Sequence, residues 1–195
     1  MKKLNSLYKL NSLGFNTPIF IPIYKRSDLI KNIDQIKLLS PLSIRSDHPT
    51  KDGIVFPFFP DQSFENALIH IEEILDKGLI AIVQKSVNPK ESSIAGKYLK
   101  YENYGIIEYF IGVGTIREEM EGLNNNLRYV ECNDRKILNR FITPDIEPFI
   151  TDINSQIIRD TWCLISPCCI EWAIYPYEIG MLNKKIIFWE TYKLK

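Results

Sequence analysis

The sequence lacks a long hydrophobic run and an excess of charge of either sign. No apolar stretch among its 195 residues approaches the roughly 20 residues that a membrane-spanning helix needs. The 24 lysine and arginine residues balance 24 aspartate and glutamate residues, so no global field attracts nucleic acid or an anionic membrane. We therefore expect a protein that binds neither nucleic acid nor membranes.

Cysteine is also scarce. The four cysteines (132, 163, 168 and 169) are too few and too unevenly spaced for a disulfide framework, and the adjacent pair does not have a zinc-site spacing. The start of the chain has a charged tip with no continuous apolar run behind it, so we expect no signal peptide. These features predict reduced, mostly buried thiols and a cytoplasmic protein.

Helical and strand patterns are both present, in a chain that is 45% hydrophobic and 25% charged. Helical spacing predicts helices over 3–13, 28–36, 64–76 and 152–164, the second of them capped by Ser27. Short apolar segments predict strands over 18–24, 42–47, 79–84, 96–101, 105–111, 127–131, 137–142, 168–174 and 185–190. Residues 48–60 have the composition of a mobile loop. Because the strands outnumber the helices and run in adjacent pairs, the pattern predicts an α+β fold with antiparallel sheets, arranged in two lobes.

Two strands near the C-terminus each carry a glutamate. Alternation places Trp172 on one face of the first strand and Glu171 on the other, and Glu190 ends the second strand. A carboxylate that stays buried, charged and unpaired costs several kcal/mol. Mg²⁺ typically takes one or two carboxylates together with substrate phosphates, so this pair is a candidate metal site. The alternative is two glutamates at strand ends that point into water.

Four stretches, taken in order, share their pattern with one family. They are the spacing of Lys3, Leu7, Leu10, Gly14 and Pro18; Ser43-Ile44-Arg45-Ser46; Ile82-Val83-Gln84-Lys85-Ser86-Val87; and Pro167-Cys168-Cys169-Ile170-Glu171-Trp172-Ala173. Together they resemble the N-terminal nucleotide-binding domain of phosphoenolpyruvate synthase and pyruvate phosphate dikinase, which belongs to the ATP-grasp group. The resemblance implies one minimal ATP-grasp-like domain over 1–195. It also implies two small lobes that meet near 84–88, with the nucleotide in a cleft between them.

The resemblance further implies roles for residues in the first half of the chain. Lys3 and Arg45 would contact phosphate oxygens and serve both nucleotide binding and catalysis, because an ammonium and a bidentate guanidinium neutralise phosphates. The backbone of Gln84, Lys85, Ser86 and Val87 would pair with the adenine edge. The residues themselves also allow Lys3 to be a frayed surface lysine, Arg45 to form an ordinary surface salt bridge, and Gln84 simply to end a strand.

In the second half, the resemblance implies that Glu108 lies near the nucleotide. Glu171 and Glu190 would hold Mg²⁺ bridging the β- and γ-phosphates. Two departures from the family pattern stand beside this metal pair. Cys169 replaces an aspartate, and Tyr192 replaces an arginine that would contact the γ-phosphate. The second departure weakens the case for phosphoryl transfer more than the case for nucleotide binding.

The leading hypothesis is therefore a Mg²⁺- and ATP-binding protein, an ATP-dependent phosphotransferase or ligase that acts on a small-molecule or protein acceptor. The alternative is a degenerate nucleotide-binding or scaffold module without turnover. A third hypothesis is an interaction protein that has kept only the fold.

Overall fold

The computed structural model describes residues 3–50, 57–86, 94–102, 104–111, 128–133, 136–140, 156–157, 159–161, 163–175 and 185–194. Its contacts divide the chain into two compact units. Unit 1 comprises Met1–Lys9 and Thr17–Asn88, and unit 2 comprises Leu10–Asn16 and Pro89–Lys195. Within the described ranges, no helix is both long enough and apolar enough to cross a lipid bilayer.

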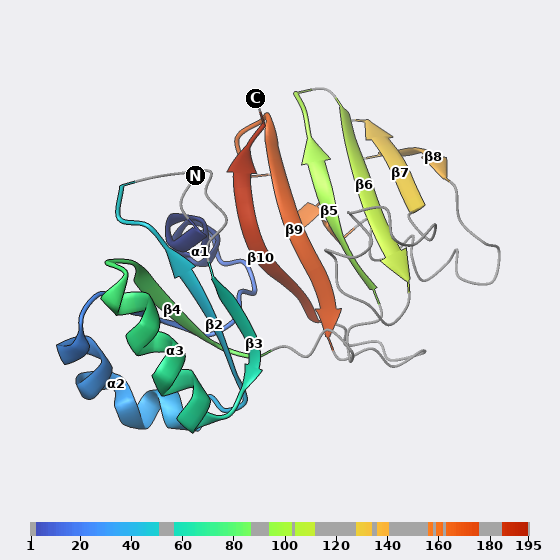
Figure 1. Cartoon of the computed structure of the whole chain (residues 1–195). Coiled ribbons are helices and arrows are strands. Elements are labelled where there is room, and N and C mark those ends of the chain that lie inside the picture. Colours follow the sequence, from blue (N-terminus) through green and yellow to red (C-terminus); the bar gives the residue numbers. More distant parts are fainter. Residues whose placement is uncertain are drawn as a thin grey trace. The chain divides into compact units, whose positions relative to one another are not determined.

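Unit 1 contains a four-stranded antiparallel sheet in the order β1-β4-β2-β3. Its elements are α1 (Lys3–Ser12, whose residues from Leu10 on belong to unit 2), β1 (Phe20–Ile23), α2 (Arg26–Leu38), β2 (Leu42–Asp47), β3 (Phe58–Gln62), α3 (Phe64–Asp76) and β4 (Ile80–Lys85). Helices α2 and α3 cover one face of this sheet and α1 covers the other (Figure 1). Both faces are therefore buried, which explains why β4 is apolar along almost its whole length.

Because side chains alternate along a strand, neighbouring residues of β2 and β4 pack against helices on opposite faces of the sheet. Ile44 and Val83 point towards α2 and α3 and pack on Ile71. Ile82, one residue before Val83, points the other way and packs against Leu4 of α1. The α1 face of the unit 1 sheet thus receives every second residue of β2 and β4.

Two details of unit 1 differ from the sequence-based predictions. The segment predicted as a loop, 48–60, includes the start of strand β3, an edge strand that accommodates Pro60, while residues 51–56 of that prediction lie outside the described residues. Helix α2 begins before Ser27, which is not its cap. Instead, the Asp28 carboxylate accepts hydrogen bonds from the backbone N–H groups of Tyr24 and Lys25 at 3.1 and 3.2 Å. An aspartate in the first turn thus binds the two backbone N–H groups that directly precede the helix.

Unit 2 contains a six-stranded antiparallel sheet in the order β10-β9-β5-β6-β7-β8 (Figure 1). The strands are β5 (Ile94–Lys100), β6 (Tyr104–Ile111), β7 (Arg128–Asn133), β8 (Lys136–Arg140), β9 (Cys168–Tyr175) and β10 (Lys185–Lys193). The predicted pairing of two C-terminal strands is confirmed, since β9 and β10 are antiparallel neighbours. The helix predicted over 152–164 is described only in part, at 156–157 and 159–160.

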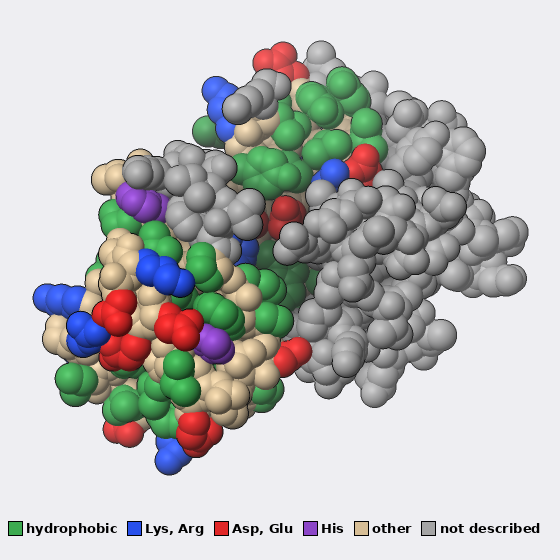
Figure 2. Space-filling view, viewed as in Figure 1, with side chains coloured by type: hydrophobic (Ala, Val, Ile, Leu, Met, Phe, Trp, Pro, Cys, Tyr) green, Lys and Arg blue, Asp and Glu red, His purple; other side chains and the backbone are tan. Residues whose placement is uncertain are grey.

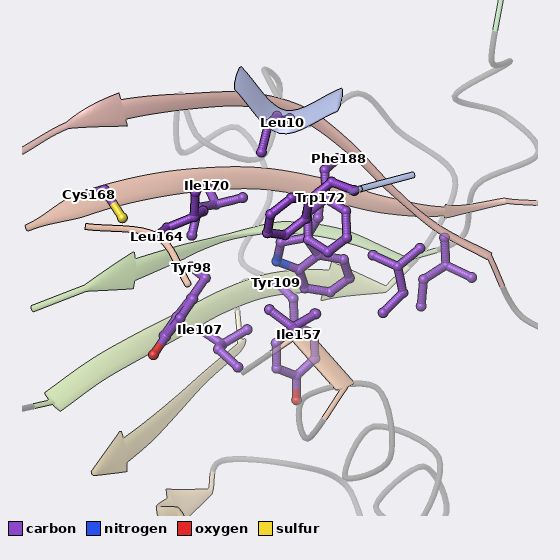
Figure 3. Close-up of a cluster of buried hydrophobic side chains, with 13 residues drawn as sticks. Leu10, Tyr98, Ile107, Tyr109, Ile157, Leu164, Cys168, Ile170, Trp172 and Phe188 are labelled. Carbon is purple, nitrogen blue, oxygen red and sulfur yellow. The ribbon is translucent and has the colours of Figure 1, made fainter. Parts of the chain in front are cut away.

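One face of the unit 2 sheet packs into a hydrophobic cluster around Trp172. This side chain is fully buried, and Tyr109 and Phe188 lie beside it (Figure 3). Phe15 meets Phe188 edge to face at a centroid distance of 4.9 Å. Ile170, Trp172 and Ile174 all belong to this cluster. The predicted alternation of β9 is therefore confirmed, and Glu171 lies on the opposite face.

Candidate functional site

Four ionisable residues form a row across the face of unit 2 that lies opposite the Trp172 cluster. In the strand register, Glu190 faces Glu171, Glu171 faces Lys97, and Lys97 faces Glu108. Directly opposed residues have Cβ atoms about 4.5–5.5 Å apart. We call Glu190, Glu171, Lys97 and Glu108 the charged row. Figure 2 shows acidic and basic side chains lying among hydrophobic ones over β9, β5 and β6.

A β-bulge places Glu190 in the charged row. The register of β10 against β9 shifts between Phe188 and Glu190, so that Trp189 is the extra residue. Trp189 packs against Ala95 and Ala173, on the charged face. Strict alternation would have put Glu190 on the same face as Phe188, inside the core. The bulge therefore brings the two predicted metal ligands, Glu171 and Glu190, to one face on adjacent strands.

A neutral pair lies next to these glutamates. Cys169 and Tyr192 are opposed in the β9–β10 register, and their side chains are hydrogen-bonded. Burial raises the pKa of the Cys169 thiol to about 12, against the opposing effect of the hydrogen bond from Tyr192. Burial also raises the pKa of the Tyr192 hydroxyl. Both groups are therefore protonated at neutral pH, and Cys169 does not supply a thiolate.

The donor set of the charged row fits a hard divalent cation. Within the described part of the chain, no three His, Cys, Asp or Glu side chains converge on one point, so a closed zinc-type site is not found there. Two carboxylates on one face are what Mg²⁺ uses when phosphates and water complete its coordination. Like charges directly opposed across two strands repel each other, and a bound cation between Glu171 and Glu190 would relieve that repulsion.

In unit 1, the predicted phosphate-binding residues share the α1 face of the sheet. Arg45 is the cross-strand partner of Ile82, which packs against Leu4 of α1. Lys3, the first residue of α1, precedes Leu4 directly and is half-buried. Packing of α1 therefore brings Lys3 to the same face as Arg45, although they are 42 positions apart in the sequence.

Asp47, which no sequence pattern predicted as a functional residue, anchors the start of α1. Its carboxylate accepts hydrogen bonds from the backbone N–H of Leu4 (Oδ2, 2.9 Å) and of His48 (Oδ1, 2.9 Å). Asp47 is only 2% exposed. A carboxylate at a helix N-terminus satisfies free N–H groups and interacts well with the helix dipole. Capping residues normally lie just before a helix. Asp47 lies 43 residues after Leu4, so no local sequence pattern identifies it as a cap.

Gln84 carries a buried amide at the end of β4. Its side chain is 2% exposed, and no described group lies within hydrogen-bonding distance of its Nε2. The register places Ser43 of β2 opposite Gln84. Buried amide donors almost always have partners, so this atom is a candidate contact for a ligand.

The backbone after Gln84 is already engaged. The N–H of Lys85 donates to Ile19 O at 3.2 Å, and the N–H of Ser86 donates to Pro41 O at 2.8 Å. The Ser86 hydroxyl donates to the Asp61 carboxylate. An adenine base that used these two N–H groups would have to displace their present partners. Val87, the last predicted adenine contact, lies outside the described residues.

Two cavities within the separate units do not coincide with the predicted ligand residues. One of about 400 Å³ lies in unit 1, beside Leu4, Asp47 and Leu79. The other, of about 510 Å³, lies in unit 2, beside Asn16 and Asp160. Neither is lined by Arg45, Glu171 or Glu190. The candidate site therefore rests on the charged row and on the α1 face, and not on either cavity.

Comparisons with known proteins bear on the fold. No protein-family model matches the chain, and no curated protein sequence matches it. Solved structures do match. N5-carboxyaminoimidazole synthase from Aspergillus clavatus, in complex with ADP and 5-aminoimidazole ribonucleotide, has a TM-score of 0.52 at 13% identity, over 100% of this chain and 44% of that one. D-alanyl-alanine synthetase A from Vibrio cholerae has a TM-score of 0.50 at 12% identity, over 97% of this chain and 54% of that one.

The chain has an ATP-grasp fold. A protein from Pyrococcus horikoshii shares the fold over most of its own length, with a TM-score of 0.55 at 14% identity, over 93% of this chain and 85% of that one. This chain spans about half the length of the two ATP-grasp ligases. At these identities the likeness extends to the fold and not to a substrate.

Proposed function

We propose that this ATP-grasp protein binds Mg·ATP and uses it as an ATP-dependent ligase or phosphotransferase on a small-molecule or protein acceptor. The observation that carries the proposal is the pairing of Glu171 with Glu190 on one face, through the bulge in β10. The fold likeness supports it, since one neighbour was solved with ADP. We also propose that unit 1 and unit 2 are the two lobes of one domain that meet near 84–88, with the nucleotide in the cleft between them.

Each residue has a defined part in the proposal. Glu171 and Glu190 hold Mg²⁺, which when bound neutralises charge on the β- and γ-phosphates. Lys3 and Arg45 contact phosphate oxygens, and their shared position on the α1 face of unit 1 supports that pairing. Glu108 stands in the charged row near the metal pair.

The nucleoside end of ATP would lie against the end of β4. The buried Gln84 amide offers a donor, while the backbone of Lys85, Ser86 and Val87 is proposed to follow the adenine edge. The resemblance to phosphoenolpyruvate synthase favours transfer of a phosphoryl group. The neighbours that are ligases favour ATP-dependent ligation instead. A cytoplasmic location belongs to the same proposal, and the free Cys163, Cys168 and Cys169 support it.

Nucleotide binding without turnover is the second candidate. The neutral Cys169–Tyr192 pair stands where the resemblance implies an aspartate and an arginine, and these two residues are direct partners across β9 and β10. Loss of the arginine removes a cation that would stabilise charge on the γ-phosphate. A degenerate module would bind Mg·ATP but release no ADP or AMP in the presence of candidate acceptors.

Calorimetric titration with ATP, with and without Mg²⁺, tests the proposal. We expect Mg²⁺-dependent binding that weakens at least about tenfold in Glu171→Gln and in Arg45→Ala, because each change removes a charge that the proposed metal or phosphate contact uses. Glu73→Gln in α3 and Arg26→Ala in α2 change exposed side chains; they are the matched controls and should bind like the parent.

Thermal unfolding of each variant would show that the fold is kept. If the parent protein bound no ATP at millimolar concentration, the nucleotide-dependent function would be excluded and the fold assignment would stand. If Glu171→Gln and Arg45→Ala both bound as the parent does, the site would lie elsewhere.

A further inference from the structure

The charged row contains three carboxylates and one ammonium. Lys97 lies inside the row, between Glu108 on one side and Glu171 on the other. We propose that Lys97 is a positioning residue that sets the cation affinity of the Glu171–Glu190 pair. The inference rests on the proposed metal site and adds to it a residue that none of the four family-like stretches contains.

The contact between Lys97 and Glu108 is well defined. Lys97 Nζ lies 2.8 Å from Glu108 Oε2, and the two side chains are 23% and 25% exposed. A pair of this kind is less screened by water and salt than a fully exposed one. The ion pair thus holds the ammonium on the charged face, one strand away from Glu171.

Electrostatics gives the two members of the pair opposite effects on a bound cation. The Lys97 ammonium repels a divalent cation at Glu171 and Glu190, whereas the Glu108 carboxylate attracts it. Because the interaction falls with distance and Glu108 is one strand further away, the effect of Lys97 is the larger. Lys97 also offsets the repulsion among the carboxylates when no cation is bound, which keeps the row compatible with folding.

Binding of Mn²⁺ alone, measured by calorimetry, tests the inference without nucleotide or turnover. We expect Lys97→Met, which keeps the apolar stem, to bind Mn²⁺ about three- to tenfold more tightly than the parent. Glu108→Gln should bind it more weakly, and Lys97→Arg should restore the parent affinity. Lys193→Met is the matched control: it removes an exposed lysine three residues beyond Glu190 and should leave the affinity within about twofold.

The two variants should change the Mn²⁺ affinity in opposite directions, and this distinguishes an electrostatic role of Lys97 from a purely structural one. Lys97→Met and Glu108→Gln break the same ion pair, so a purely structural role would shift both affinities in one direction and overturn the inference. Parent-like binding by Lys97→Met, with binding lost in Glu171→Gln, would overturn the role of Lys97 and leave the proposed function intact. No Mn²⁺ binding by the parent would remove the metal site and the inference together. If Lys97→Met did not fold, unchanged binding by Glu108→Gln would still overturn the inference.

Discussion

Single residues of unit 2 show how burial changes chemistry. Lys100 is 7% exposed, and its Nζ donates to the carbonyl oxygens of Leu164 at 2.6 Å and Thr161 at 3.4 Å. The two carbonyl oxygens accept hydrogen bonds from the ammonium and partly replace the water that it loses on burial. Burial nevertheless lowers the pKa of Lys100, against the opposite influence of Cys168 and Cys163. Lys100 is thus a structural lysine, in contrast to the partly exposed Lys97.

The lowered pKa of Lys100 predicts a pH dependence of stability. The folded state holds this proton less tightly than the unfolded chain, whose lysine keeps its ordinary value of 10.5. At a pH between the pKa of Lys100 in the folded state and its pKa in the unfolded chain, unfolding therefore takes up protons. Across that range the free energy of unfolding rises with pH. We expect the free energy of unfolding of the parent, relative to Lys100→Met, to increase from neutral pH towards pH 10. Urea unfolding of both proteins at each pH measures this difference, and a difference independent of pH would contradict it.

At the scale of elements, close approach of strands β5 and β6 depends on Gly96. A Cβ atom at Gly96 would lie 2.1 Å from the carbonyl oxygen of Glu108 and 2.9 Å from the Cα of Tyr109. At Gly105 the obstacle is different, because a Cβ atom there would meet the ring of Tyr98 at 2.3 Å. The first clash is with the backbone and the second with a side chain, so the two glycines constrain the sheet differently.

This difference predicts an order of stabilities. Gly96→Ala must push β5 and β6 apart, and we expect it to destabilise unit 2 by at least about 1–3 kcal/mol. Gly105→Ala should cost less, because the Tyr98 ring can turn aside. Chemical denaturation of the two variants measures the order. If both variants lost the same free energy of unfolding, or if Gly105→Ala lost more, the close approach of β5 and β6 at Gly96 would not be the stronger constraint on the sheet.

At the scale of the whole molecule, the proposed nucleotide site draws residues from both units. Arg45 belongs to unit 1 and Glu171 to unit 2, and the proposal assigns both to one Mg·ATP. Anything that binds only the folded state stabilises it, by about 2.7 kcal/mol at a ligand concentration 100 times the dissociation constant. Ligand-dependent stability is therefore a measure of whether both units contribute.

We expect saturating Mg·ATP to raise the melting temperature of the parent protein. At the same ligand concentration the rise should be smaller in both Arg45→Ala and Glu171→Gln, as measured by scanning calorimetry. ATP with a chelator, in place of Mg²⁺, is the control and should give little shift. A reduction in only one of the two variants would mean that a single unit holds the nucleotide.

Much of the fold followed from local patterns. The alternation in β9 placed Trp172 in the core and Glu171 on the other face, and the helical spacing of 64–76 gave α3 with its correct bounds. Such patterns are read correctly because one buried face suffices to fix the side of every second residue. The strand β3 was missed because its proline and aromatic residues resemble a loop until the edge of a sheet gives them a place.

The sequence by itself determined the elements, their faces and the presence of two glutamates on two C-terminal strands. Only the tertiary structure decided that these glutamates meet, because the bulge at Trp189 reverses the face on which Glu190 would otherwise lie. It also decided that Lys97 stands between Glu108 and Glu171, and that Asp47 holds the start of α1 beside Lys3. Each of these depends on register or packing between segments far apart in the chain, and no local periodicity carries that information.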